Sequence, residues 1–360
     1  MNASQPPDDA ARPVRAPSPV RDLYPGIFAM VMATGICAIS ASQHGVRWLA
    51  ITLHAIAAVM YAVLVVLLVL RVVRYPRAVW TDLTSHARGF AFLTVVAATN
   101  VLAESTGIVH ARWGVTEALA LASVPLWCVL AYVPLSAAVI GGDKPGLERG
   151  INGTWFLLVV STESVAAVCG LLLAREGGDL LAFAALGAFA LGLVLYVVVM
   201  TMLFLRWTFV RVTPDELDPP AWIAAGAVAI TALAGSNLLI AADRVPRLAE
   251  LAPVLEGAVV LAWATSTFWV PLMVVLGVWR HLVRRVPLRY QPAYWAMVFP
   301  LGMYAAATYR MRDAIDLDGL GWLPTVALVV ALAAWLPTFA GLVHGLVRRR
   351  RDAPRVAAVP

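Results

Sequence analysis

Charged residues are scarce in this chain of 360 residues. Only 13% of the sequence is Asp, Glu, Lys or Arg, and 61% is hydrophobic, whereas soluble domains carry about 25% charged and about 45–50% apolar residues. A water-soluble protein of this length would need far more polar surface to cover its core. The net charge of +6 comes from short clusters between long apolar runs. The composition therefore excludes a soluble enzyme and predicts a chain that binds no nucleic acid, because basic clusters in this arrangement orient a protein in a membrane.

Residues that build disulfides, metal sites and covalent cofactor sites are also few. The three cysteines lie singly inside apolar runs, which excludes a disulfide scaffold and a CxxC zinc site. The six histidines are isolated and none has the spacing of a metal-binding pair. Lys144 is the sole lysine and lies between apolar runs, which excludes a Schiff base inside the membrane. The sequence also lacks the GxxxxGK[ST] loop that binds ATP. We therefore expect neither a cofactor nor a metal ion.

Long apolar runs dominate what remains, and a helix of about 20 residues is enough to cross a bilayer. Residues 1–24 are rich in Pro, Arg and Asp and predict a disordered cytoplasmic tail. Residues 25–346 form the predicted membrane domain, and residues 347–360 a basic cytoplasmic tail. The ten predicted membrane spans are 25–42, 48–70, 89–108, 115–140, 152–173, 180–205, 221–242, 256–279, 291–310 and 322–346.

The basic residues predict the orientation of these spans. With the N-terminus inside, 20 Lys and Arg residues fall in inside segments and 7 in outside segments, as expected when cytoplasmic loops carry the positive charge. An even number of spans places both termini in the cytoplasm. We therefore expect a multi-pass protein of the cell membrane.

The spans also repeat. The odd-numbered spans begin at residues 25, 89, 152, 221 and 291, at nearly even intervals, and Pro-Gly-Ile-Phe-Ala-Met-Val at 25–31 resembles Pro-Ala-Tyr-Trp-Ala-Met-Val at 292–298. Such repetition predicts five tandem helical hairpins. The odd spans are richer in Ser, Thr, Asn and Gln than the even spans. Because lipid-facing helices have no use for such groups, we expect the odd helices to line a central pore and the even helices to lie outside, although small polar residues also serve helix packing.

Phe299 and Pro300 form the most informative pair in the ninth span. A proline inside a helix frees the carbonyl four residues earlier and kinks the helix, and Gly302 would loosen the same turn. A phenylalanine held at such a kink could project across a narrow path and close it by excluding water. The alternative is that Phe299 packs against lipid or a neighbouring helix.

Glu163 is the most central charge, in the middle of the fifth span. An ionised carboxylate at that depth is costly, so Glu163 is expected to be protonated, hydrated or paired. It is either a proton site coupled to transport or a neutral acid that bonds a neighbouring helix. The other candidate residues are polar side chains for the pore lining, Thr34, Asn100, Ser161 and Asn237, and two charges for the mouths, Arg310 outside and Arg206 inside.

Several stretches resemble one known family. Tyr294–Thr308 is similar to the ninth-helix stretch of the tellurite-resistance/dicarboxylate transporter family, and so in bacterial members are Asn152–Trp155, Arg206–Trp207 with Thr213–Pro214, and Pro219–Ile223. That family includes tellurite-resistance permeases, fungal malate and sulfite permeases, and plant slow anion channels. The resemblance covers about residues 24–346. It implies ten helices in five hairpins, a homotrimer with one pore in each subunit, and the role of pore-occluding phenylalanine for Phe299.

Together these observations predict a protein that moves small inorganic or organic anions, such as dicarboxylates, sulfite, nitrate or chloride, through a gated pore in the lipid bilayer. A proton-coupled carrier that uses Glu163 is the main alternative. A membrane-embedded enzyme would need convergent acids or histidines at one face; the acidic loop 213–220 is the nearest approach, and the loops are too short for a catalytic chamber. A structural scaffold would have no reason to concentrate polar groups on alternate helices.

Overall fold

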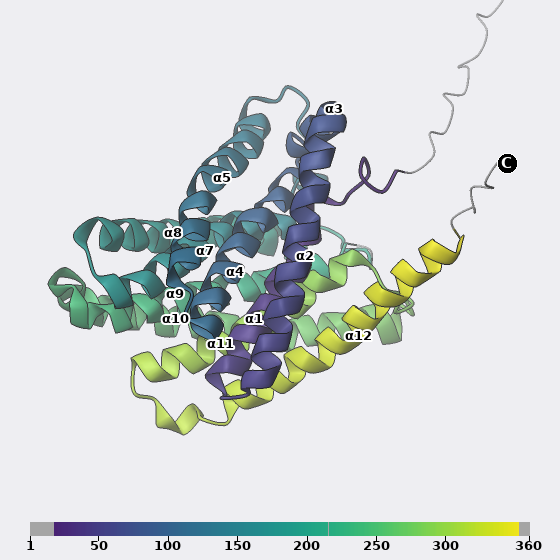
Figure 1. The fold of residues 1–360 in the computed structure, drawn as a ribbon. Helices are drawn as coiled ribbons and strands as arrows, with labels where there is room; N and C mark the ends of the chain where they lie inside the picture. Colours follow the sequence, from purple (N-terminus) through teal and green to yellow (C-terminus); the bar gives the residue numbers. More distant parts are fainter. Residues whose placement is uncertain (1–17, 215, 353–360) are drawn as a thin grey trace, which may run out of the picture.

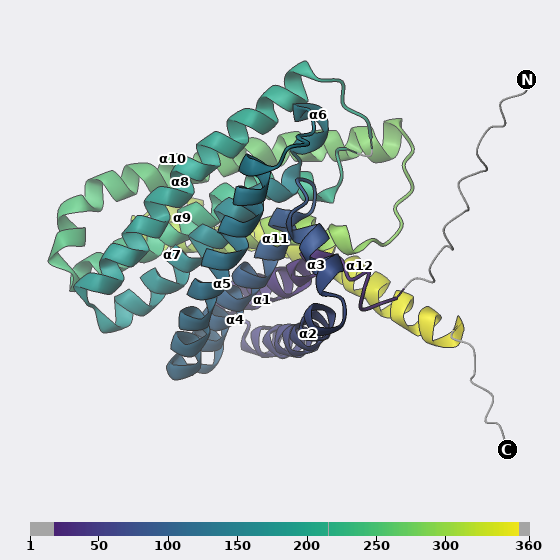
Figure 2. The same ribbon diagram turned by 90° about the horizontal axis from the view of Figure 1, so that it is seen from above.

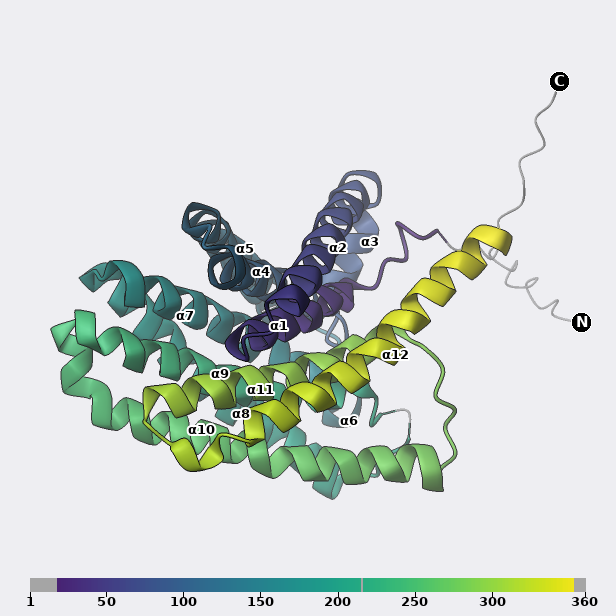
Figure 3. The same cartoon turned by 60° about the horizontal axis from the view of Figure 1, so that its bottom comes forward.

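The computed structural model describes residues 18–214 and 216–352. Within these ranges every regular element is a helix, with no strand among them (Figure 1). The predicted N-terminal tail lies outside the described residues up to residue 17, and the predicted C-terminal tail from residue 353 onward. The first described residues and the last turn of the final helix lie at the same end of the bundle (Figures 1 and 3).

Five helices form a closed inner ring. Each of them contacts the next one in chain order, and the last contacts the first. In four of the five, 89–94% of the most apolar stretch is buried inside the protein. The inner helices are α1 (Ala29–Gln43), α4 (Thr94–His110), α7 (Phe156–Glu176), α9 (Ile223–Ala241) and α11 (Trp295–Ala314).

Five longer helices surround this ring, and only 17–33% of their apolar stretches is buried. They are α2 (Arg47–Arg74), α5 (Trp113–Ile140), α8 (Asp179–Phe209), α10 (Pro246–Val278) and α12 (Leu323–Asp352). Each packs on the inner helix before it and also touches the next inner helix. In Figure 2, α8 and α10 lie along one edge of the bundle and α2 along the opposite edge. Because their outward faces carry exposed Val, Leu and Phe, this is the surface that a bilayer covers. The predicted inner and outer sets are confirmed.

A 3₁₀ turn precedes every inner helix, and these five turns also form a closed ring. They are η1 (Pro25–Phe28), η2 (Gly89–Leu93), η3 (Gly153–Trp155), η4 (Pro219–Trp222) and η7 (Pro292–Tyr294). The contact between η3 and η4 is so close that a Cβ added to Gly153 would collide with the backbone of Pro220. The same turn at the start of each unit supports the predicted five-fold repeat.

Short elements fill the connections: α3 (Pro76–Leu83), α6 (Leu147–Gly150), η5 (Ala242–Arg244), the π turn η6 (Trp279–Val283) and η8 (Asp318–Leu320). The largest error in the predicted boundaries is in the eighth span, which begins at Pro246 and not at 256. Pro246 occupies the first turn, where proline is tolerated. Pro253 lies inside the helix without ending it. The final helix likewise runs to Asp352, into the predicted tail.

Nine helices in the described part of the chain are long and apolar enough to cross a membrane. The predicted span 291–310 is not among them. It is nevertheless a continuous helix of 20 residues, α11, that lies between α1 and α9 and carries Arg310, Arg312 and Asp313 near its end. The chain is therefore a helical membrane protein, and the tenth crossing stays a prediction.

Candidate functional site

A cavity lies at the end of the inner ring where all five inner helices begin. The space inside it that water could occupy is about 20 Å³, and every one of its lining residues is uncharged. Each repeat contributes to the wall through its 3₁₀ turn or the first turns of its helix: Gly26, Ala29 and Met32; Thr94; Thr154 and Leu157; Pro220 and Ile223; Pro292, Ala293, Ala296 and Phe299; Tyr24 completes the lining. The cavity therefore lies on the axis of the ring.

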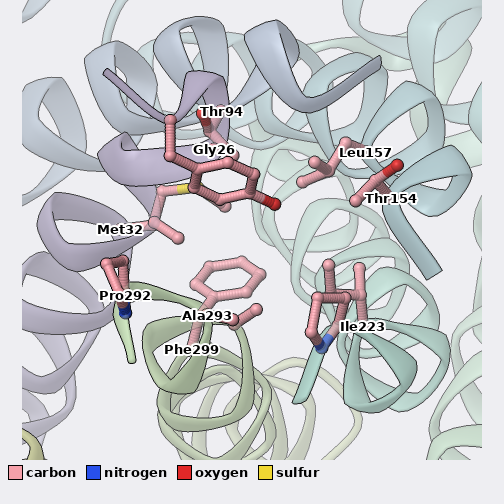
Figure 4. A pocket seen from close by; sticks show the side chains of 13 residues that line it. Gly26, Met32, Thr94, Thr154, Leu157, Ile223, Pro292, Ala293 and Phe299 are labelled. Carbon is pink, nitrogen blue, oxygen red and sulfur yellow. The ribbon is translucent and has the colours of Figure 1, made fainter. Parts of the chain in front are cut away.

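Phe299 forms part of the wall of this cavity. Its side chain is 1% exposed, and its ring projects between Met32 and Ile223 toward the centre of the cavity (Figure 4). Met32, Ala296 and Ile223 line the cavity beside it, together with the hydroxyl-bearing Tyr24, Thr94 and Thr154. The structure thus places Phe299 at the ring axis, where its role as a gate was predicted.

Pro300 and Gly302 hold the segment around Phe299 against both neighbouring inner helices. A Cβ added to Gly226 of α9 would lie 2.7 Å from Cγ of Pro300, and one added to Gly302 would lie 2.7 Å from Cγ2 of Ile36 on α1. Such small residues let helices approach closely in a membrane. α11 is a continuous helix through Pro300, so the predicted kink stays a prediction.

A wider vestibule, with about 380 Å³ of space that water could occupy, adjoins the cavity and shares Tyr24, Thr154 and Pro220 with it. Its wall includes Arg206, which is 5% exposed and was predicted as a charge at this mouth. Arg206 donates from Nε to the carbonyl oxygen of Glu148 at 2.9 Å, and its Nη2 lies 3.0 Å from Oε1 of Glu216. The positive charge of Arg206 is therefore largely compensated.

Two vestibule residues were not singled out in the sequence. Tyr24, which the sequence placed in the tail, lies over Gly26, and burial raises the pKa of its hydroxyl to about 12. Burial also raises the pKa of Asp218 to about 6, although the nearby charge of Arg280 opposes that shift. Arg280 donates to the carbonyl oxygen of Leu217 at 2.9 Å and to that of Pro214. Tyr24 and Asp218 each lie directly before a 3₁₀ turn, and this position is the signal that could have identified them.

Glu163 is fully buried, and its contacts lie with α9 and α8. The hydroxyl of Thr231 donates to its Oε1 at 3.0 Å, while Oε2 has no hydrogen-bond partner in the described part of the chain. The carboxylate lies so close to Gly192 on α8 that an added Cβ there would collide with it. These contacts place the carboxyl group at the junction of three helices, toward the outer layer.

Two of the predicted pore-lining residues bond neighbouring helices, and a third bonds its own helix. Thr34 accepts a hydrogen bond from Nε1 of Trp335 on α12 at 3.0 Å. Asn100 donates to Oγ of Ser164 at 2.9 Å, which links α4 to α7, and its own Oδ1 is buried without a partner. The hydroxyl of Ser161 donates to the carbonyl oxygen of Leu158 at 3.2 Å within α7.

Asn237 and Arg310 meet at the other end of the inner ring. Nε of Arg310 donates to Oδ1 of Asn237 at 2.8 Å, and Nδ2 of Asn237 donates to the carbonyl oxygen of Ala167 on α7 at 3.0 Å. Glu104 on α4 is 3% exposed and interacts electrostatically with Arg310. Glu104 lies near the end of its predicted span, and only the packing of α4 in the ring shows that it is buried inside the protein.

Among residues 18–214 and 216–352 no three His, Cys, Asp or Glu side chains come together in an arrangement that could hold a metal ion. The free cysteines Cys37, Cys128 and Cys169 lie on three different helices.

Comparisons with known proteins agree with this architecture. The family model described as voltage-dependent anion channel matches residues 22–343. An uncharacterized membrane protein of Mycobacterium tuberculosis is 39% identical over 152 residues, which is 42% of this chain and 77% of that relative. An uncharacterized transporter of Methanocaldococcus jannaschii is 20% identical over 320 residues, covering 84% of this chain and 90% of the relative. Because the family model spans nearly the whole ring of helices, the chain belongs to the voltage-dependent anion channel family.

Proposed function

We propose that this protein is a gated pore that carries small anions across the membrane along the axis of the inner ring, and that the ring of Phe299 closes it. The observation that carries the proposal is the convergence of five helix starts on one axial cavity with Phe299 in its wall. Membership of the family supports anion transport in general. Phe299 is proposed as the gate because of its position in the wall of this cavity.

The direction of the inner helices favours anions over cations. All five begin at the cavity, so the positive ends of five helix dipoles and their first backbone N–H groups surround the axis there. No carboxylate lines the cavity to offset this field. A weak, distributed attraction of this kind lets an anion enter without holding it too tightly to leave.

The surroundings of Phe299 suit a hydrophobic gate. Met32, Ile223 and Ala296 line the same cavity as Phe299 and offer no hydrogen bond to water; Tyr24, Thr94 and Thr154 are its hydroxyl-bearing residues. An anion that passes the ring of Phe299 would lose more hydration than the attraction of the helix dipoles replaces, which is how an apolar constriction blocks conduction. Removal of the ring would widen the constriction and let water through. A small side chain at position 299 is therefore expected to open the pore.

The test is anion flux in proteoliposomes with wild type, Phe299→Ala and a matched control. Phe156 is the control because it is also a fully buried phenylalanine on an inner helix, but its ring lies against Tyr196 of α8, 5.7 Å between centroids. We expect Phe299→Ala to raise the flux of chloride and nitrate many-fold, and Phe156→Ala to leave it unchanged per folded molecule. Equal flux in all three proteins would contradict the gate.

A proton-coupled carrier is the competing function, and Glu163 was its predicted proton site. The contacts of Glu163 with Thr231 and Gly192 favour a role in helix packing. The flux assay separates the two functions when it is run at two pH values. Flux that follows the anion gradient alone supports the pore, whereas flux that is driven by a proton gradient supports the carrier.

We also propose a homotrimer in the cell membrane with both termini in the cytoplasm. The excess of basic residues on one side supports this orientation, and the two described ends of the chain lie on the same side of the bundle (Figure 3). The family resemblance supports the trimer. Native mass measurement in detergent and labelling of cysteines introduced near each terminus test these two points.

A further inference from the structure

A pocket that the proposed pore does not use lies beside the vestibule, where the end of α10 meets the turns η4 and η7. It holds about 110 Å³ of space that water could occupy, and it shares Asp218 and Ala221 with the vestibule. Most of its wall is apolar and includes Trp222, Met273 and Leu288. Four polar side chains complete the wall: Asp218, Arg280, His281 and Tyr294. A mostly apolar pocket in which a few polar groups converge is typical of a ligand site.

Arg280 is held so that one edge of its guanidinium group is left over. The residue is 7% exposed, and its Nη1 donates to the carbonyl oxygens of Pro214 and Leu217. Its Nε is buried without a hydrogen-bond partner among the described residues, and Nη2 has none there either. Nε–H and Nη2–H point in the same direction and form the edge that binds two oxygens of a phosphate or carboxylate group. A buried donor without a partner indicates a ligand or water that it serves.

The pocket lies next to the lipid-facing surface of α10. Val275 and Val278 are exposed on that helix and are the chain neighbours of the lining residues Leu276 and Gly277. Arg280 follows in the π turn η6, at the end of α10 that is predicted to face the cytoplasm. Lipid headgroups lie at the ends of membrane helices, and basic pockets between such helices bind them. A lipid in the bilayer can therefore place its headgroup in the pocket and keep its acyl chains along α10.

Asp218 gives the pocket a second charge, of the opposite sign. Burial raises its pKa to about 6, so its carboxyl group is mainly ionised at pH 7.5. Asp218 and Arg280 line the same pocket, yet they form neither a hydrogen bond nor an ion pair within 4.0 Å. A ligand with negative charge alone would be attracted by Arg280 and repelled by Asp218. A zwitterion with a phosphate and an ammonium group gives both side chains a partner.

We propose that this pocket binds the headgroup of a zwitterionic membrane lipid, with the phosphate on the Nε–Nη2 edge of Arg280 and the ammonium group on the carboxylate of Asp218. Phosphatidylethanolamine has this chemistry. Its ammonium group donates hydrogen bonds, whereas the trimethylammonium group of phosphatidylcholine has no N–H and phosphatidylglycerol carries no cation. The site does not depend on the proposed pore, because lipid binding is measured without any flux.

The binding test uses the purified full-length protein, freed of lipid in detergent at pH 7.5, and native mass spectrometry with pairs of lipids that have the same acyl chains. We expect wild type to retain phosphatidylethanolamine about tenfold over phosphatidylglycerol and over phosphatidylcholine, as a charge-assisted hydrogen bond predicts. Equal retention of the three lipids would overturn the inference.

Thermal unfolding in detergent distinguishes a lipid from a soluble ligand of the same chemistry. Phosphatidylethanolamine should raise the unfolding temperature in a saturable way. Glycerophosphoethanolamine, the same headgroup without acyl chains, should have little effect at the same concentration, because the apolar wall then lacks its partner. An equal effect of the two would show that the ligand is a soluble phosphate ester and would overturn the lipid.

Asp218→Asn is the decisive variant for the proposed headgroup. It removes the partner of the ammonium group and the repulsion of an anionic lipid, so the preference for phosphatidylethanolamine over phosphatidylglycerol should disappear. Arg280→Gln should instead weaken the retention of both lipids, because both use the phosphate. A wild-type preference in Asp218→Asn would contradict the proposed role of the carboxylate.

Gly277→Met decides the question if Arg280→Gln disturbs the loop that Arg280 holds. A Cβ added to Gly277 meets no atom within 4 Å, so a longer side chain can enter the pocket without a collision. Gly257→Met, also on α10 with open space around the added Cβ, is the matched control. We expect Gly277→Met to lower the retention of phosphatidylethanolamine about tenfold and Gly257→Met to leave it as in the wild type. Equal retention in these two variants would show that the lipid binds elsewhere.

Discussion

The hydroxyl of Thr231 on α9 lies 3.0 Å from Oε1 of Glu163 on α7, which places a fully buried acid at a junction between helices. The third side of that junction is the backbone of α8 at Gly192. The absence of a side chain at position 192 is what makes room for the carboxyl group. The arrangement has the geometry of a packing contact.

Gly192→Ala is therefore expected to destabilise the protein. The added methyl would collide with the carboxyl group of Glu163, and overpacking of this kind costs about 1–3 kcal/mol. Thermal unfolding in detergent measures the change. Gly187→Ala, on the same helix with open space around the added methyl, is the control and should be neutral or slightly stabilising. Equal effects of the two substitutions would show that Glu163 does not pack against Gly192.

Glu163→Gln tests whether Glu163 carries protons during transport. Glutamine keeps the shape of the side chain and the oxygen that accepts from Thr231, so we expect stability to change by about 0.5 kcal/mol or less. We also expect the pH dependence of anion flux to remain as in the wild type, because the carboxyl group contacts α8 and α9. Loss of proton-driven flux in this variant would instead identify a carrier.

Asp218 predicts a pH dependence at the vestibule. Its pKa lies at about 6 because burial disfavours the carboxylate, and the charge of Arg280 opposes that effect only in part. As the pH falls from 7 to 5 the negative charge is lost, and anions should enter the vestibule more readily. In the Phe299→Ala background we expect the flux to rise about twofold or more over this range.

In the Phe299→Ala background, Asp218→Asn should give the higher anion flux already at pH 7 and abolish the increase between pH 7 and pH 5. Asp243→Asn, at an exposed position in η5, is the matched control and should keep it. Protonation of Asp218 also affects stability. Because the pKa of Asp218 in the folded state lies above its ordinary value of 3.8, the folded state gains stability relative to the unfolded state as the pH falls through 6 toward 4. A flat flux profile in the presence of Asp218 would contradict its role at the mouth.

The helices could be predicted from the sequence because their apolar runs leave no other structure available in lipid. The distinction between inner and outer helices was also predictable, since Ser, Thr, Asn and Gln gather on the buried set. The start of the eighth span was missed by ten residues, as Arg247, Glu250 and Pro253 gave its first turns the composition of a loop. Composition alone cannot distinguish such helical turns from a loop that connects two helices.

The direction in which each polar side chain points was the part that the sequence could not supply. Glu163 and Thr34 lie on inner helices, but their contacts are with α8, α9 and α12. Glu104 lies near the end of its predicted span, and only the closed ring buries it within electrostatic reach of Arg310. The rotation of each helix about its own axis depends on how the repeats pack against one another, and this packing cannot be inferred from a single sequence.

The gate is the central claim, and the most direct measurement is the current through single molecules of wild type and Phe299→Ala in planar bilayers with a potassium chloride gradient. We predict that wild type is nearly silent and that Phe299→Ala shows discrete openings whose reversal potential lies close to the equilibrium potential of chloride. Openings that reverse near the potassium potential, or a Phe299→Ala protein as silent as the wild type, would contradict the account.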